Sequence, residues 1–112
     1  MKYLSLLQET RFAIWPFDHA TTRVVVEIYP RLFTGPINKS DRRQREDYLS
    51  RPEFQKLPKE WCDIAASCED AFDAAISAFR MHQHATEIRS LRRTTDSELL
   101  LEGMIWHPNS VN

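Results

Sequence analysis

The sequence predicts an α/β fold, and three stretches of residues carry that prediction. Residues 22–29 contain an almost continuous run of β-branched residues, which is typical of a buried and usually parallel strand. Residues 61–79 carry apolar side chains at the spacing of an amphipathic helix. Residues 99–106 form a second apolar run near the C-terminus. Strand, helices and strand in this order are expected of an α/β domain.

The elements around the first long strand follow from the same periodicities. Residues 2–9 resemble the last turns of an amphipathic helix, because their leucines are spaced for one apolar face. Residues 11–15 form a predicted short strand, which Pro16 ends. The strand at 22–29 is ended in the same way by Pro30.

The rest of the chain is predicted to be mostly helical. The charged stretch 40–50 is expected to be an exposed helix start or a solvated connector. Residues 61–79 are expected to form one helix or two, with Ser67 capping the second. Residues 81–93 are expected to continue the helix and then unwind before the closing strand at 99–106.

Composition limits the class of protein. The 112 residues fit one domain or part of a domain, and 42% hydrophobic with 28% charged content is that of an ordinary globular protein. The 15 basic residues nearly balance the 16 acidic ones, so any contact with nucleic acid must be local or mediated by metal. Only two glycines occur, which excludes a glycine-rich phosphate loop.

Cysteines and hydropathy indicate the expected location. Cys62 and Cys68 have neither the spacing nor the partners of a zinc site or a disulfide framework, so we expect both to be reduced. Residues 1–10 are too short and too polar for a signal peptide, and no apolar run approaches the roughly 20 residues that span a bilayer. A cytoplasmic protein without a membrane contact is therefore expected.

Glu27 is the first candidate site residue. Strand alternation places it on the face of Val25 and Tyr29, near the C-terminal end of its strand, where open α/β sheets hold ligands. A carboxylate between apolar neighbours is costly unless it is paired, hydrogen-bonded or bound to metal. The alternative is an edge glutamate, or one paired with Arg23 or Arg31.

Asp70 and Asp73 form the second candidate. Helical spacing puts them about 60° apart on one edge, with Ser77 between them. Two like charges at this spacing repel unless a cation lies between them. The alternative is that Ser67 and Asp70 form a capping box and that acids favour the start of a helix. That alternative explains Asp70 well and Asp73 poorly.

Several motifs occur in an order that resembles a known family. They are Trp-Pro-Phe-Asp at 15–18, Val-Val-Val-Glu-Ile-Tyr-Pro at 24–30, the acidic helix at 69–78 and Glu-Gly-Met-Ile-Trp-His-Pro at 102–108. Together they resemble the C-terminal half of a family of predicted RNase H-like nucleases, the domain of unknown function 429. The resemblance covers about residues 1–108, and it implies an RNase H-like fold.

The resemblance also implies roles for the acids. Asp70-x-x-Asp73-Ala74 is similar to the last-helix acids of RuvC-type resolvases. In such folds a strand glutamate, helix acids and an aspartate on the first strand hold Mg²⁺ or Mn²⁺, so Glu27 would take the strand role and Asp70 and Asp73 the helix role. The chain departs from the family because the N-terminal strands and their aspartate are missing. Asp18 belongs to a different motif and does not replace that aspartate.

The implied function is metal-dependent phosphodiester hydrolysis. A carboxylate-held two-metal site would activate water and stabilise the leaving oxygen, with the cations ~4 Å apart. Oxygen-only ligands suit Mg²⁺ or Mn²⁺ better than zinc. Catalytic and metal-binding roles are therefore expected for Glu27, Asp70 and Asp73. The missing first-strand aspartate leaves open whether this chain is active.

Two groups of basic residues are candidates for nucleic-acid contact. The more positive group consists of Arg89, Arg92 and Arg93. The other group, which is interleaved with acids and so more typical of a solvated, self-paired face, consists of Lys39, Arg42, Arg43 and Arg45.

A second class of function stays open on the sequence. Half of a sheet leaves open edges and apolar faces, so the chain would form a homo-oligomer or pair with a companion segment that completes the sheet. In that case it is a non-catalytic binding or dimerisation module, a degenerate relative of the nuclease fold.

Overall fold

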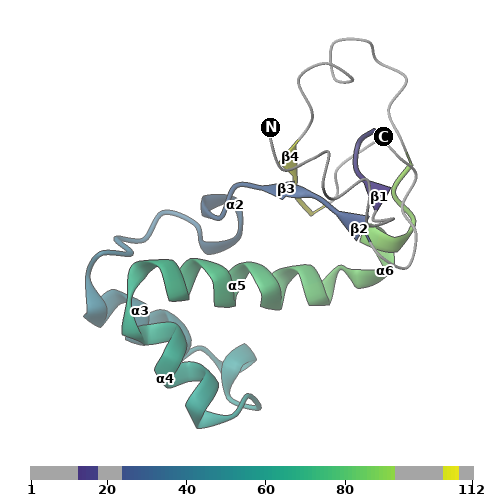
Figure 1. Ribbon diagram of the computed structural model, residues 1–112. Coiled ribbons are helices and arrows are strands. Elements are labelled where there is room, and N and C mark those ends of the chain that lie inside the picture. The colour runs from purple at the N-terminus through teal and green to yellow at the C-terminus, as the bar shows by residue number, and fades with distance from the viewer. Residues whose placement is uncertain (1–12, 18–23, 93–104, 109–112) are drawn as a thin grey trace. The chain divides into compact units, whose positions relative to one another are not determined.

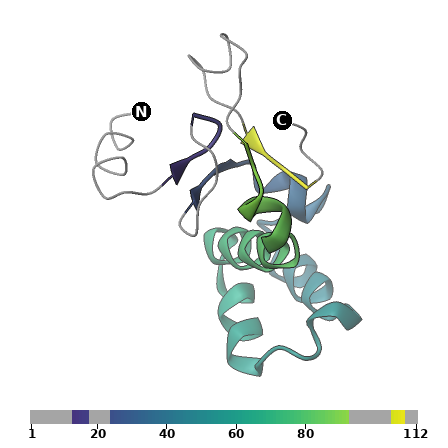
Figure 2. The same ribbon diagram turned by 90° about the vertical axis from the view of Figure 1, so that its right-hand side faces the viewer.

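The computed structural model describes residues 13–17, 24–92 and 105–108. The chain divides into two compact units. The terminal unit is formed from Met1–Tyr29 and Met81–Asn112, and the central unit is Pro30–Arg80. Figures 1 and 2 show the elements of both in two views.

The terminal unit contains short strands in parallel pairs. They are β1 (Ala13–Ile14), β2 (Val24–Val25), β3 (Glu27–Ile28) and β4 (Ile105–Trp106). β1 pairs with β2, and β3 pairs with β4, both in parallel. The predicted parallel strand is thus confirmed over its described part, but it is divided at Val26, where the run passes from one partner strand to the other. Its valines and Ile28 are half-buried rather than fully buried, and Glu27 and Tyr29 are exposed.

Two tryptophans lie in the core of the terminal unit. Trp106 on β4 is fully buried, and Trp15 after β1 is 2% exposed. The helix α6 (Ala85–Arg89) adds the buried side chain of Ile88. The Trp15 indole nitrogen donates a hydrogen bond of 3.0 Å to the carbonyl of Arg92. This bond ties the end of β1 to the segment that follows α6.

The central unit is helical. Its elements are α2 (Arg31–Thr34), α3 (Arg42–Leu49), the short 3₁₀ turn η1 (Pro52–Phe54), α4 (Lys59–Ser67) and most of α5 (Glu69–Gln83). Figure 1 shows α3 and α4 gathered at the end where the long helix α5 begins. The charged stretch predicted as a helix start or connector is therefore a helix, and Asp41 caps it by accepting a hydrogen bond of 2.9 Å from the backbone N–H of Arg43.

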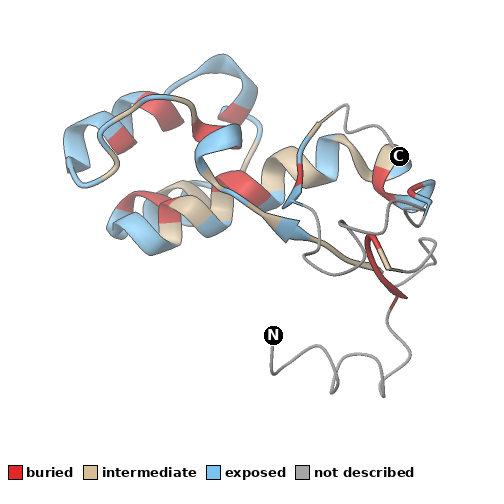
Figure 3. Cartoon of the chain, turned by 90° about the horizontal axis from the view of Figure 1, so that it is seen from above, coloured by how far each residue is buried: buried red, intermediate tan, exposed pale blue. Residues whose placement is uncertain are grey.

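Aromatic rings fill the core of the central unit. Phe54 is fully buried and lies 4.8 Å from Phe79, 5.6 Å from Tyr48 and 6.3 Å from Trp61, measured between ring centroids. Tyr48 contacts Phe72 edge to face at 5.3 Å. Such offset and edge contacts are the arrangements that aromatic pairs prefer. Buried positions accordingly recur at intervals along the helices instead of continuously (Figure 3).

Residues 61–79 lie in two helices, which confirms the second of the two alternatives, but the predicted cap is not formed. Ser67 is the last residue of α4, and its hydroxyl donates back to the carbonyl of Ile64 at 2.6 Å. The residue at the bend is Cys68, whose extended backbone interrupts the helix and whose sulfur accepts the N–H of Ala71 at 3.4 Å. The predicted Ser67 cap is therefore wrong, because the Ser67 hydroxyl bonds to a carbonyl of α4, the helix that Ser67 ends, and not to the start of α5.

The remaining expectations fall partly outside the described residues. The helix predicted at 2–9 lies wholly outside them. The closing strand at 99–106 is confirmed over β4, its described part. The prediction for 81–93 is confirmed as far as residue 92, since α5 ends at Gln83 and α6 follows before the chain leaves helical structure.

Candidate functional site

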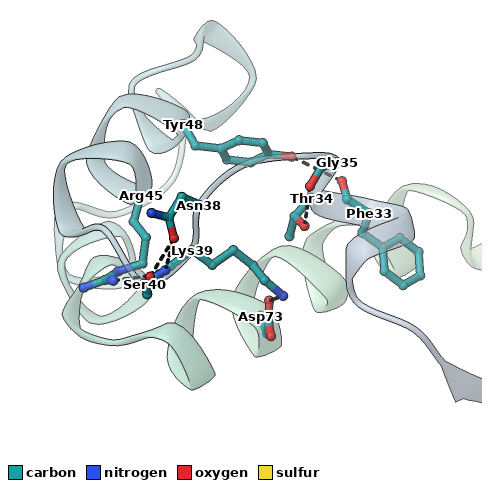
Figure 4. A network of polar contacts seen from close by, with 9 residues as sticks. All are labelled: Phe33, Thr34, Gly35, Asn38, Lys39, Ser40, Arg45, Tyr48 and Asp73. Carbon is teal, nitrogen blue, oxygen red and sulfur yellow. Dashed lines mark hydrogen bonds and ion pairs between the residues drawn. The ribbon is translucent and has the colours of Figure 1, made fainter.

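Asp73 lies in the second turn of α5 and pairs with a cationic side chain from another element. The Lys39 ammonium lies 2.7 Å from Asp73 Oδ1, and the two side chains are 15% and 23% exposed. Figure 4 shows Lys39 reaching across to the helix from the loop before α3. The helix-cap alternative does not apply to Asp73, which lies beyond the first turn of α5. It is a half-buried carboxylate whose negative charge is balanced by a positive side chain.

A buried arginine fixes the backbone of Lys39. Arg45 is only 6% exposed, and its Nη1 donates to the Lys39 carbonyl at 2.8 Å. Its Nε donates to the carbonyl of Ala66 in the last turn of α4 at 3.0 Å. A cation at a helix C-terminus is favoured by the helix dipole. Arg45 therefore satisfies two backbone acceptors and fixes the point from which the lysine side chain extends.

Polar side chains close the loop around Lys39. Asn38 Oδ1 accepts hydrogen bonds from the hydroxyl and the backbone N–H of Ser40, at 2.6 and 3.3 Å. The backbone N–H of Asn38 donates to the Gln44 side chain at 2.9 Å. Asparagine and serine commonly stabilise tight turns in this way. The loop thus has defined partners on both sides of Lys39 (Figure 4).

The other two predicted acids are exposed. Asp70 lies in the first turn of α5, beside Glu69, where the helix dipole stabilises a negative charge. Glu27 on β3 is exposed in the terminal unit, opposite Ile105 in the pairing with β4. The expectation that burial makes the Glu27 carboxylate costly is wrong, because water can solvate this group. The expected place near the C-terminal end of the strand is also wrong, because Glu27 is the first residue of β3 and pairs with the first residue of β4.

The donor chemistry of these acids fits a hard cation. Among the described residues, no group of three or more His, Cys, Asp or Glu side chains is assembled to hold a metal ion. Mg²⁺, however, is often held by one or two carboxylates together with waters and substrate phosphate oxygens. Asp70 and Asp73 on α5 could supply such a pair of carboxylates.

A hydroxyl without a partner lies one turn beyond Asp73. Ser77 is 3% exposed, and its Oγ has no hydrogen-bond partner among the described residues. A buried polar group without a hydrogen bond is costly. Four residues of separation place Ser77 on the same edge of α5 as Asp73.

The two basic groups differ in how far they are paired. Arg42 pairs with Glu46 at 2.7 Å on the exposed face of α3, which confirms the self-paired interpretation for that residue. The same interpretation is wrong for Lys39 and Arg45, whose partners lie in other elements. In the second group Arg89 and Arg92 are exposed, and Arg93 lies outside the described residues.

A second ion pair on α5 was missed by the sequence analysis. Arg80 donates to both carboxylate oxygens of Glu53, at 2.7 and 2.9 Å, and to the hydroxyl of Tyr48 at 2.9 Å. The hydrogen bonds from Arg80 lower the pKa of the Glu53 carboxyl from its usual 4.5. The same bonds raise the pKa of the Arg80 guanidinium. Nothing in the charged stretch around Glu53 indicated this partner, because the two residues are 27 apart in sequence.

Comparison of the chain with protein-family models, with curated proteins and with solved structures finds no match. None of the helices in the described part of the chain combines the length and the apolar character that crossing a membrane requires.

Proposed function

We propose that this chain carries the carboxylate part of a metal-dependent nuclease site, within an RNase H-like fold. The observation that carries the proposal is the half-buried Asp73 carboxylate, whose charge is balanced by the Lys39 ammonium at 2.7 Å. Asp73 is one of the residues for which the family resemblance implies metal binding.

The three acids would have different roles in binding the metal. Asp73 would be the central ligand, because its position on α5 is fixed and half-buried. Asp70, one turn earlier and exposed, would add charge without desolvation. Glu27, the first residue of β3 in the terminal unit, keeps the strand role that the family resemblance implies. When bound, Mg²⁺ or Mn²⁺ would polarise the phosphodiester and the attacking water.

Nucleic acid is the proposed substrate and the cytoplasm the proposed location. The exposed Arg89 and Arg92 would contact the phosphate backbone, since cationic side chains supply most sequence-independent affinity for nucleic acid. The free thiols of Cys62 and Cys68 fit a reducing compartment.

The test is cleavage of labelled single-stranded DNA, double-stranded DNA and RNA with Mn²⁺, Mg²⁺ or a chelator. Cleavage is expected with either metal and is expected to fall to background in Asp73→Asn and Glu27→Gln. The matched control is Asp63→Asn, which removes an exposed carboxylate of the neighbouring helix α4 and should cleave like the wild type. Circular dichroism and urea unfolding establish that each variant is folded.

The outcome against the proposal is equally clear. If the wild type cleaves none of these substrates and Mn²⁺ does not raise its melting temperature, the chain is not a metal-dependent nuclease. Cleavage that survives in Asp73→Asn would assign the activity to another site.

A second candidate is a non-catalytic binding or dimerisation module. The observation that favours it is the exposure of large apolar side chains beside the β3 and β4 pair, with Tyr29 53% and Ile105 43% exposed. Strands that end a short sheet also present unpaired backbone groups. Sedimentation velocity separates the candidates, because a stable dimer without metal-dependent stabilisation would favour the module.

A further inference from the structure

The contact between Lys39 and Asp73 leaves the ammonium with unused donors. An ammonium has three N–H groups, and Lys39 donates one of them, to Asp73 Oδ1. The structure gives it no other acceptor among the described residues. The Lys39 side chain as a whole is 15% exposed. A group in this situation is suited to a second, anionic oxygen.

The backbone that carries Lys39 is fixed before any ligand arrives. Arg45 holds the Lys39 carbonyl, and the flanking residues Asn38 and Ser40 are hydrogen-bonded to each other, with Asn38 also bonded to Gln44. The ammonium itself has a single contact, to Asp73, so it can turn to another anion without a change in the loop. By contrast, the Arg42 guanidinium on α3 lies on a 64% exposed side chain and is paired within its own helix.

We propose that Lys39 binds a phosphate oxygen of the substrate and that phosphodiester and divalent cation bind cooperatively at this face of α5. The assignment rests on the proposed nuclease function and adds to it the residue that holds the substrate phosphate. Ser77, whose buried hydroxyl has no hydrogen-bond partner among the described residues, lies one turn beyond Asp73 on the same edge of α5.

Charge balance explains the cooperativity. With Lys39 on Asp73 the pair is neutral and attracts neither a cation nor an anion strongly. A phosphodiester that accepts from Lys39 draws the ammonium away from Asp73, and the carboxylate then regains its affinity for a divalent cation. By linkage, the cation raises the affinity for the phosphodiester by the same factor.

The probes are Mn²⁺ and dimethyl phosphate, a small diester anion, and the measurement is isothermal titration calorimetry. For the wild type, dimethyl phosphate is expected to raise the Mn²⁺ affinity about fivefold or more. Lys39→Met should bind Mn²⁺ at least as tightly as the wild type but lose that enhancement. Lys39→Arg should restore part of it. The matched control is Lys56→Met, an exposed lysine of the same unit, which should keep the full enhancement.

A measurement on the wild type guards against a variant that does not fold. In protein labelled with ¹⁵N at lysine side chains, the Lys39 ammonium signal should move when Mg²⁺ and dimethyl phosphate are added together. A signal that stays fixed, or an enhancement that survives in Lys39→Met, overturns the assignment of Lys39. If the wild type binds no Mn²⁺ at all, the nuclease proposal fails as well; Mn²⁺ binding without Lys39-dependent coupling removes only the present inference.

Discussion

Helix α5 carries two ion pairs that are built in different ways. At Arg80 the guanidinium meets both oxygens of Glu53 and also the Tyr48 hydroxyl, and it lies over the rings of Phe54 and Phe79 at 5.6 and 5.4 Å. At Asp73 a single ammonium meets a single oxygen. Both pairs are partly buried, but the Arg80 guanidinium makes these three hydrogen bonds, whereas the Lys39 ammonium donates one to Asp73.

The difference separates a structural contact from an exchangeable one. A bidentate guanidinium–carboxylate pair is geometrically specific and strong, so replacing either partner leaves the other without an equivalent. An ammonium is a compact charge with rotatable donors, so it can move to another anion. The Arg80 pair is therefore expected to stabilise the fold, and the Lys39 pair to respond to ligands.

The largest effect is expected for Arg80→Met. It removes the two bonds to Glu53 and the bond to Tyr48 and should lower the free energy of unfolding by about 2 kcal/mol or more. Urea unfolding at pH 7 measures the change. The control Arg43→Met, on the exposed face of α3, should change stability by less than about 0.5 kcal/mol. Equal effects of the two substitutions would remove the structural role of Arg80.

A pH-dependent effect follows from Glu53. Its pKa is lowered in the folded protein by the hydrogen bonds from Arg80, so the pair stabilises the fold fully above the usual carboxyl pKa. This stabilisation is lost as the pH falls through the lowered pKa. The difference in unfolding free energy between wild type and Glu53→Gln should therefore shrink as the pH falls from 6 to about 3. A constant difference over this range would show that the charge of Glu53 is not what stabilises the pair.

The smallest effect on stability is expected for Lys39→Met. The pair has one short contact and both side chains retain some exposure, so the loss should be about 1 kcal/mol or less. Thermal unfolding monitored by circular dichroism measures it. A loss as large as that of Arg80→Met would mean that both pairs are structural and that the two do not differ as their geometry suggests.

Local periodicity predicted the parts of the fold that depend on neighbours in sequence. The parallel strand run and the apolar face of α5 with Phe72 and Ile76 were found in this way. Tyr48 and Phe54 were not recognised as core residues, because they lie in a stretch dominated by charges and prolines. Their burial depends on partners from α5 that no local pattern specifies.

The candidate site likewise combines features that the local sequence predicts with partners that are distant in sequence. Asp73 was singled out correctly as the acid that a helix cap does not explain, but its partner Lys39 is 34 residues away. For Glu27 the argument from burial was wrong, because it assumed a strand covered on both faces, whereas β3 is two residues long and leaves this side chain exposed. An alternating pattern identifies which face a residue occupies and not whether that face is covered.

Arg45 joins two segments, the loop before α3 and the end of α4, through the carbonyls of Lys39 and Ala66. Neither can open without exposing a carbonyl that this side chain satisfies, so the two should exchange their amide hydrogens with solvent as a single cooperative unit. A ligand that immobilises Lys39 should then slow amide exchange in the last turn of α4, although it touches no atom there. Hydrogen-exchange protection in α4 would report the occupancy of a site on another helix.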